Sequence, residues 1–95
     1  MSIKVMAKVW ESKLESHYKL LCLCLADYAD DSGANIYPRV KTMADRTTVS
    51  VRTAQRILRD LKQLGIISPV GKTARGTIRY QLNLDAVTTY EPAKK

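Results

Sequence analysis

The sequence predicts a small, mainly α-helical domain that is completed by a two-stranded β-hairpin. Apolar residues recur every three or four positions from Val51 to Leu64, which is the spacing of an amphipathic helix. The segment His17–Ala29 is apolar on nearly all sides, as expected of a helix buried at the centre of a small bundle. From Thr77 to Leu84 apolar and polar residues alternate, which indicates a half-buried strand.

Length and composition fit one globular domain. The chain has 95 residues, and we expect the domain to span residues 1–84 and a flexible tail to follow at 85–95. No apolar run approaches the roughly 18 residues that span a bilayer, and the N-terminus lacks a signal-peptide pattern. We therefore expect a cytoplasmic protein with no membrane contact. Cys22 and Cys24 cannot bridge each other within one helix, and we expect them to be ordinary buried side chains.

The N-terminal half is predicted to contain two helices. In Ser2–Glu11 an apolar stripe of Ile3, Met6, Ala7 and Trp10 favours a short amphipathic helix, although a strand remains possible. Residues 12–16 form a polar connection, and Ser16 is the expected N-cap of the helix that begins at His17. The sequence DDSGANIYP then has the composition of a loop.

A short helix and a longer helix are predicted in the middle of the chain. The first, Arg39–Arg46, follows a proline and directs Val40, Met43 and Ala44 inward. Ser50 is placed to cap the second helix, and Gly65 to end it. The inward stripe of the second helix is predicted to contain Val51, Ala54, Ile57, Leu58, Leu61 and Leu64.

The rest of the chain predicts a hairpin. The runs IISPV and TIRYQLNL are separated by the basic, glycine-bounded segment GKTARG. Three to four helices followed by a two-stranded hairpin have the plan of a winged helix-turn-helix.

The positive charge is concentrated in one segment. The formal net charge is +7, and residues 39–79 alone hold ten basic and two acidic side chains, a net charge of +8. The remaining residues hold six basic and seven acidic side chains. Such an asymmetry predicts a polyanionic partner.

The two middle helices have the pattern of a DNA-reading pair. The segment TMADRTTVSVRTAQRIL places the small Ala44 where the helices touch and the apolar Val49 in the turn between them. It resembles the helix-turn-helix families of bacterial and phage DNA-binding proteins, except that Thr48 stands where many members have Gly. The longer stretch from His17 to Ser68 resembles the winged helix-turn-helix domains of phage and plasmid replication initiators and small regulators.

The outer face of the second helix holds the candidate reading residues. Arginine fits the paired acceptors of guanine, and glutamine fits adenine. Four side chains in the first half of the helix are predicted to read bases: Arg52, Thr53, Gln55 and Arg56. Seven residues are predicted to contact phosphates: Arg39, Lys41, Ser50, Arg59, Lys72, Arg75 and Arg79. An ion pair between Asp60 and Arg56, four positions apart, would weaken the reading role of Arg56.

These patterns favour binding over catalysis. The single histidine, His17, has no acid and nucleophile to join it, and the sequence indicates no catalytic set, cofactor or metal site. Tyr18, Tyr28 and Trp10 are expected in the core.

The predicted partner is double-stranded DNA. The resemblance implies that the protein acts in phage or plasmid replication initiation or in transcription regulation. A homodimer through Met6 and Trp10, or tandem binding on DNA, is expected to strengthen binding. The alternative is a protein-binding winged helix, such as a phage-encoded inhibitor of a host protein.

Overall fold

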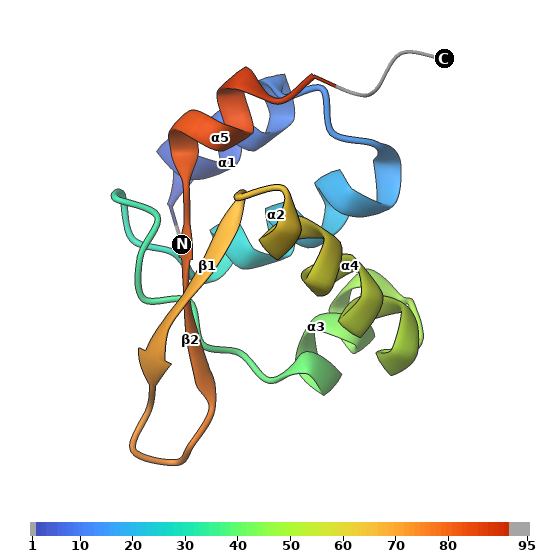
Figure 1. Ribbon diagram of the computed structural model, residues 1–95, viewed down its shortest axis with the longest axis vertical. Helices are drawn as coiled ribbons and strands as arrows, with labels where there is room; N and C mark the ends of the chain where they lie inside the picture. The colour runs from blue at the N-terminus through green and yellow to red at the C-terminus, as the bar shows by residue number, and fades with distance from the viewer. Residues whose placement is uncertain (1, 92–95) are drawn as a thin grey trace.

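The fold consists of helices gathered around one central helix, with a hairpin along one side. A computed structural model describes residues 2–91, and within them the chain forms five helices and two strands (Figure 1). In chain order these are α1 (Ile3–Glu11), α2 (Ser16–Tyr28), α3 (Val40–Thr47), α4 (Val51–Gln63), β1 (Ile67–Lys72), β2 (Ile78–Leu82) and α5 (Leu84–Thr89). The order and the hairpin fit a winged helix-turn-helix, as the sequence predicted.

Helix α2 is the centre of the core. It contacts α1, α3 and α4, and Leu21, Cys22 and Leu25 are fully buried in it. The prediction of a central helix is therefore confirmed. Its start differs from the expectation, because Glu15 occupies the N-cap position without a side-chain hydrogen bond and Ser16 is already the first helical residue.

The helix-turn-helix pair has the predicted boundaries to within one residue. The hydroxyl of Ser50 caps α4 by accepting a hydrogen bond from the amide of Thr53 at 3.0 Å, and Gly65 adopts a left-handed φ of 76° after the helix. Ala44 is buried where α3 meets α4. In the turn, the amide of Val49 donates to the carbonyl of Ala44, and the side chain of Val49 is half-buried.

The hairpin is joined to the helices through the loop that precedes α3. Strands β1 and β2 pair antiparallel, with a bulge between Pro69 and Gly71. Ile36 pairs with β2 through one isolated antiparallel bridge, in which the amide of Tyr80 donates to the carbonyl of Ile36 at 2.7 Å. Gly33 makes this approach possible, because a Cβ there would lie 2.5 Å from the carbonyl oxygen of Leu82. The hairpin is therefore held in a fixed place beside α3.

The carboxylate of Asp30 organises the same loop. It accepts hydrogen bonds from the amides of Ser32 and Ala34 and from the side chains of Ser32 and Asn35. These donors lower the pKa of Asp30 to about 2, with the Ser32 hydroxyl as the largest cause. The loop thus has a defined shape in spite of its exposed position.

The N-terminal segment is a helix, but the predicted apolar face is wrong. Val5 and Val9 are fully buried, whereas Ile3 and Trp10 are 75% and 62% exposed. Trp10 is thus a surface residue rather than a core residue. The buried side is fixed by α2 and α5, which pack on α1, and neither contact is visible in the periodicity of the segment.

Two further expectations need correction. Val51 and Leu64 are 42% and 45% exposed, so the inward stripe of α4 is shorter than predicted and ends before the helix termini. Leu84–Thr89 forms helix α5, with Val87 buried against α1, where we expected strand and then tail. The last residues of the expected tail, 92–95, lie outside the described part of the chain.

None of the helices within residues 2–91 has the length and apolar character needed to cross a membrane.

The turn between α3 and α4 leads to a stability prediction. Thr48 has a left-handed φ of 58°, which is unfavourable for a β-branched residue by roughly 1–2 kcal/mol. We expect Thr48→Gly to relieve this strain, and the greater freedom of glycine in the unfolded chain to offset part of the gain. The net stabilisation should be about 0.5–1 kcal/mol, a rise in Tm of a few degrees by calorimetry. Thr88→Gly, in the ordinary backbone of α5, should lower Tm instead, and a fall in both variants would contradict the account.

Candidate nucleic-acid interface

The outer side of α4 presents the predicted reading residues together. The inner side is occupied by Ala54, Ile57, Leu58 and Leu61, all of which are buried. The opposite side borders a single hollow of about 520 Å³ that is open to solvent. Its lining consists of Arg52, Thr53, Gln55, Arg56 and Arg59. All four predicted base readers therefore share one surface, and Arg59, predicted to contact phosphate, lies next to them.

The start of α4 is already capped from within the chain. The hydroxyl of Ser50 accepts from the Thr53 amide and donates to the Thr53 hydroxyl, at 3.0 Å in both cases. Both hydroxyls are therefore engaged with each other. The amides of Val51 and Arg52, which precede the first intrahelical hydrogen bond, remain the polar groups that this helix start offers to an anion.

Asp60 does not pair with Arg56. Its carboxylate instead accepts a hydrogen bond from the phenol of Tyr18 on α2. Within residues 2–91 Arg56 makes no ion pair. No local sequence pattern predicts this contact, because its partners are 42 positions apart and Tyr18 was expected in the core. The contact engages Asp60 with α2, and Asp60 forms no ion pair with Arg56 within residues 2–91.

The basic side chains outside α4 fall into two groups. Lys41 forms an exposed ion pair with Asp45 at 3.5 Å, and such a pair holds its partners only weakly. Arg46 is held firmly, because it bonds Asp27 and the hydroxyl of Tyr28, each at 3.0 Å, and lies over the Tyr28 ring. The other basic residues of segment 39–79 make no ion pair within the described part of the chain.

The hairpin places its basic residues at different depths. Lys72 ends β1 and Arg75 lies in the turn at residues 73–77, and both are exposed. Arg79 is half-buried in β2, and its Nε has no hydrogen-bond partner among residues 2–91. Arg39, at the start of α3, borders the same cleft as Arg75.

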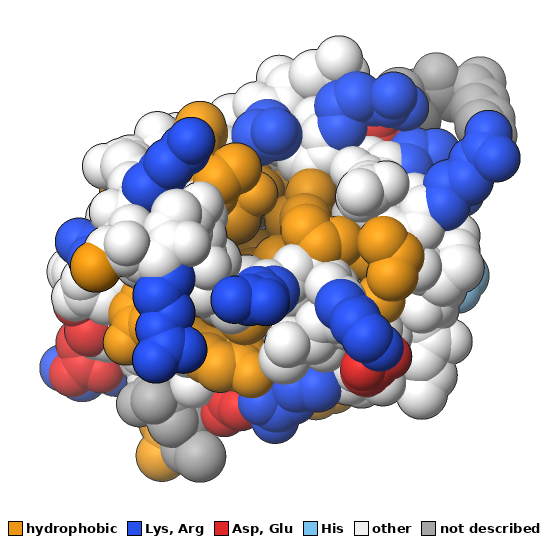
Figure 2. All heavy atoms as spheres, turned by 90° about the horizontal axis from the view of Figure 1, so that it is seen from below, with side chains coloured by type: hydrophobic (Ala, Val, Ile, Leu, Met, Phe, Trp, Pro, Cys, Tyr) orange, Lys and Arg blue, Asp and Glu red, His pale blue; other side chains and the backbone are white. Residues whose placement is uncertain are grey.

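These side chains contribute to a strongly basic face. Helix α3, the N-terminal part of α4 and the hairpin turn lie at the same end of the molecule (Figure 1). Figure 2 looks onto that end and shows Lys and Arg side chains distributed around an apolar hollow, with fewer acidic side chains, mostly toward the lower edge. The arrangement suits an extended polyanion that contacts several elements at once.

Comparison with known families agrees with the geometry. The chain matches a helix-turn-helix domain family over residues 13–67, which is more than half of its length. The match covers α2, α3 and α4 and reaches the first residue of β1. The chain belongs to this helix-turn-helix family, and DNA binding is the function that membership supports. Such families are typically not enzymes. No curated protein matched the chain significantly.

The contact between Tyr18 and Asp60 predicts a shifted titration. The hydrogen bond to the Asp60 carboxylate raises the pKa of Tyr18 above its ordinary value, and burial and the negative charge add to the rise. Because the folded-state pKa is raised, the stabilisation is fully present below about pH 10 and is lost as the pH rises through the raised value.

We expect Asp60→Asn to lower the pKa of Tyr18. Phenolate absorbance is titrated against pH for each protein and for the same protein with Tyr18→Phe. The difference between the two titration curves gives the pKa of Tyr18. Asp45→Asn, which removes the exposed partner of Lys41, serves as the matched control and should leave the Tyr18 titration in place. An identical Tyr18 midpoint in wild type and Asp60→Asn would show that the hydrogen bond does not form in solution.

Proposed function

We propose that this domain binds double-stranded DNA sequence-specifically, with α4 in the major groove. The observation that supports it most strongly is the outer face of α4, where Arg52, Gln55 and Arg56 are exposed together and form no ion pair within residues 2–91. A helix whose inner side is buried against a bracing helix, and whose outer side offers free donors, is suited to reading base edges.

Each part of the proposed interface has a separate role. Arg52 and Arg56 donate paired hydrogen bonds to guanine, and Gln55 fits adenine. Thr53 lies at the helix start, where its methyl group is the available reading surface because its hydroxyl is engaged by Ser50. The phosphate contacts are assigned to Arg39, Lys41, Ser50, Arg59, Lys72, Arg75 and Arg79, with the amides beside Ser50 rather than its hydroxyl as the donors.

The proposed cellular role is replication initiation or transcription regulation in a phage or plasmid. Binding to an origin and binding to an operator require the same reading surface, so both follow from the proposed contacts. The resemblance of the segment from His17 to Ser68 to domains of such proteins supports this role. DNA binding of this kind takes place in the cytoplasm of a bacterial host, which is the proposed location.

Salt dependence of binding tests the DNA interaction. Six charged side chains are proposed at phosphates, so log Kd against log salt concentration should have a slope of magnitude roughly 5. A mobility-shift titration with random duplex at several salt concentrations measures it. Failure to bind at low salt would rule out the DNA function and favour a winged helix that binds protein.

Two substitutions separate base reading from phosphate contact. Arg52→Ala should relax the preference at one base position, with a loss of about 5-fold to 150-fold on the preferred site and little on random duplex. Lys72→Ala should weaken all sequences alike and reduce the salt slope by about 1. Lys8→Ala, on the exposed side of α1, is the matched control and should change neither. A uniform loss for Arg52→Ala together with a sequence-dependent loss for Lys72→Ala would reverse the assigned roles.

We further propose self-association through α1. The exposed side of α1 carries Ile3 and Trp10, beside the half-buried Met6, and α1 lies at the end of the molecule away from the hairpin turn (Figure 1). A pair joined there keeps both basic faces free for separate sites on DNA. Analytical ultracentrifugation should show a dimer that Trp10→Ala weakens. Monomers alone, both free and on DNA, would remove this proposal and leave tandem binding.

A further inference from the structure

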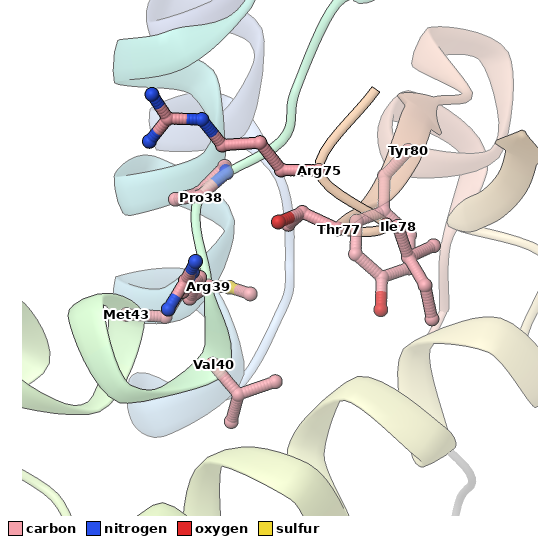
Figure 3. Close-up of a pocket in the computed structure, with 9 residues that line it drawn as sticks. Pro38, Arg39, Val40, Met43, Arg75, Thr77, Ile78 and Tyr80 are labelled. Atoms are coloured by element: carbon pink, nitrogen blue, oxygen red, sulfur yellow. The ribbon is translucent and has the colours of Figure 1, made fainter. Parts of the chain in front are cut away.

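An apolar cleft separates the start of α3 from the hairpin. It has a volume of about 320 Å³, at the low end of the range of roughly 300–1,000 Å³ that is usual for small-molecule sites. Val40 and Met43 line it from α3, and Ile78 and Tyr80 line it from β2. Arg75 reaches from the hairpin turn toward the side formed by Pro38 and Arg39 (Figure 3). The cleft thus has apolar walls and a guanidinium group from each side.

A second hollow continues this cleft around the arginines. Its volume is about 390 Å³, and it shares Arg39, Arg75 and Thr77 with the first hollow. Tyr37 lines it and is 52% exposed. Because Tyr37 is exposed and lines the hollow, its ring is accessible to a ligand.

Intact duplex DNA matches only the charged part of this surface. The outside of a duplex presents charged phosphates and sugars, and the faces of its bases are covered by stacking. Phosphates suit Arg39 and Arg75, but they leave the apolar walls and the Tyr37 ring without a partner. An unpaired nucleotide supplies both kinds of group, because its phosphate is an anion and its base has an exposed π-face that stacks on aromatic rings and guanidinium planes.

We propose that the two hollows form a site for unpaired nucleotides of a DNA strand. Val40 and Ile78 form the apolar walls, Tyr37 stacks on a base, and Arg39 and Arg75 hold the flanking phosphates. The inference rests on the proposed function in one respect: a duplex read by α4 brings a strand to the neighbouring hairpin. The domain therefore prefers a duplex with an unpaired segment next to its site over a fully paired duplex.

Fluorescence anisotropy with matched DNAs tests this site. The probes are a blunt duplex, the same duplex with a thymidine tail on either the 3′ or the 5′ end, and the thymidine tail alone. We expect one tailed duplex to bind at least about 5-fold more tightly than the blunt duplex, the gain expected from stacking one base. Tyr37→Ala should abolish this preference and leave blunt-duplex affinity within about 2-fold.

Two variants control for indirect effects. Tyr37→Phe retains the stacking ring and should retain the tail preference. Val70→Ala changes another exposed apolar residue of the hairpin, 54% exposed and outside both hollows, and should behave as wild type. A loss of preference in Tyr37→Phe as well as in Tyr37→Ala would overturn the stacking role of the ring.

The remaining outcomes separate this site from the proposed function. Equal affinity for tailed and blunt duplex would overturn the site and leave duplex reading in place. Binding of the tailed duplex and the tail alone, without binding of the blunt duplex, would support the site and overturn duplex reading. Displacement of the tail by thymidine monophosphate at equal nucleotide concentration would indicate a free-nucleotide site and overturn the assignment to a strand. Absence of binding to every DNA would overturn both.

Discussion

The burial of one side of α4 is the constraint on which the rest of the site depends. Ala54 and Leu61 are fully buried and Leu58 nearly so, against α2, α3 and β1. Burial of such apolar side chains contributes roughly 1.5–3 kcal/mol each for the larger ones, so the helix cannot rotate without a large loss of stability. Because the inner side is fixed, the side chains one half-turn away are fixed at the surface. Arg52 and Arg56 are exposed for this reason.

Three aspartates are engaged by partners other than the arginines of α4 and the hairpin. Asp60, the acid closest in sequence to the reading residues, is held by Tyr18 on α2, and Asp27 is engaged by Arg46. Asp30 is surrounded by hydrogen-bond donors of its own loop. Each contact satisfies a carboxylate without an arginine of α4 or of the hairpin. The excess positive charge therefore remains available for an anionic partner.

Local sequence signals predicted the helix-turn-helix well, because the interactions that define it are themselves local. Ser50, Gly65 and the stripe from Ala54 to Leu61 act within one helix and its ends, and the structure confirms them. The buried side of α1 could not be predicted, because α1 has apolar residues on two sides and only the packing of α2 and the distant α5 selects Val5 and Val9.

Contacts between distant segments were also invisible in the sequence. The hydrogen bond from Tyr18 to Asp60 and the cleft between α3 and the hairpin both require residues about 40 positions apart to meet. Tyr37 lies in a predicted loop before a proline, and only the bridge between Ile36 and Tyr80 places it beside the hairpin turn. The reading residues stay predictions, since sequence and geometry establish their exposure and not their contacts with bases.

Amide chemical-shift mapping by NMR on addition of duplex DNA identifies the face of the domain that contacts DNA. The largest changes should fall on residues 50–59, which comprise the N-cap and first part of α4, on the start of α3 and on the hairpin turn at residues 73–77. Helices α1 and α5 should change little at equal protein and DNA concentrations. Changes concentrated on α1 and α5, with α4 unaffected, would contradict the claim that the buried stripe of α4 directs a reading face toward DNA.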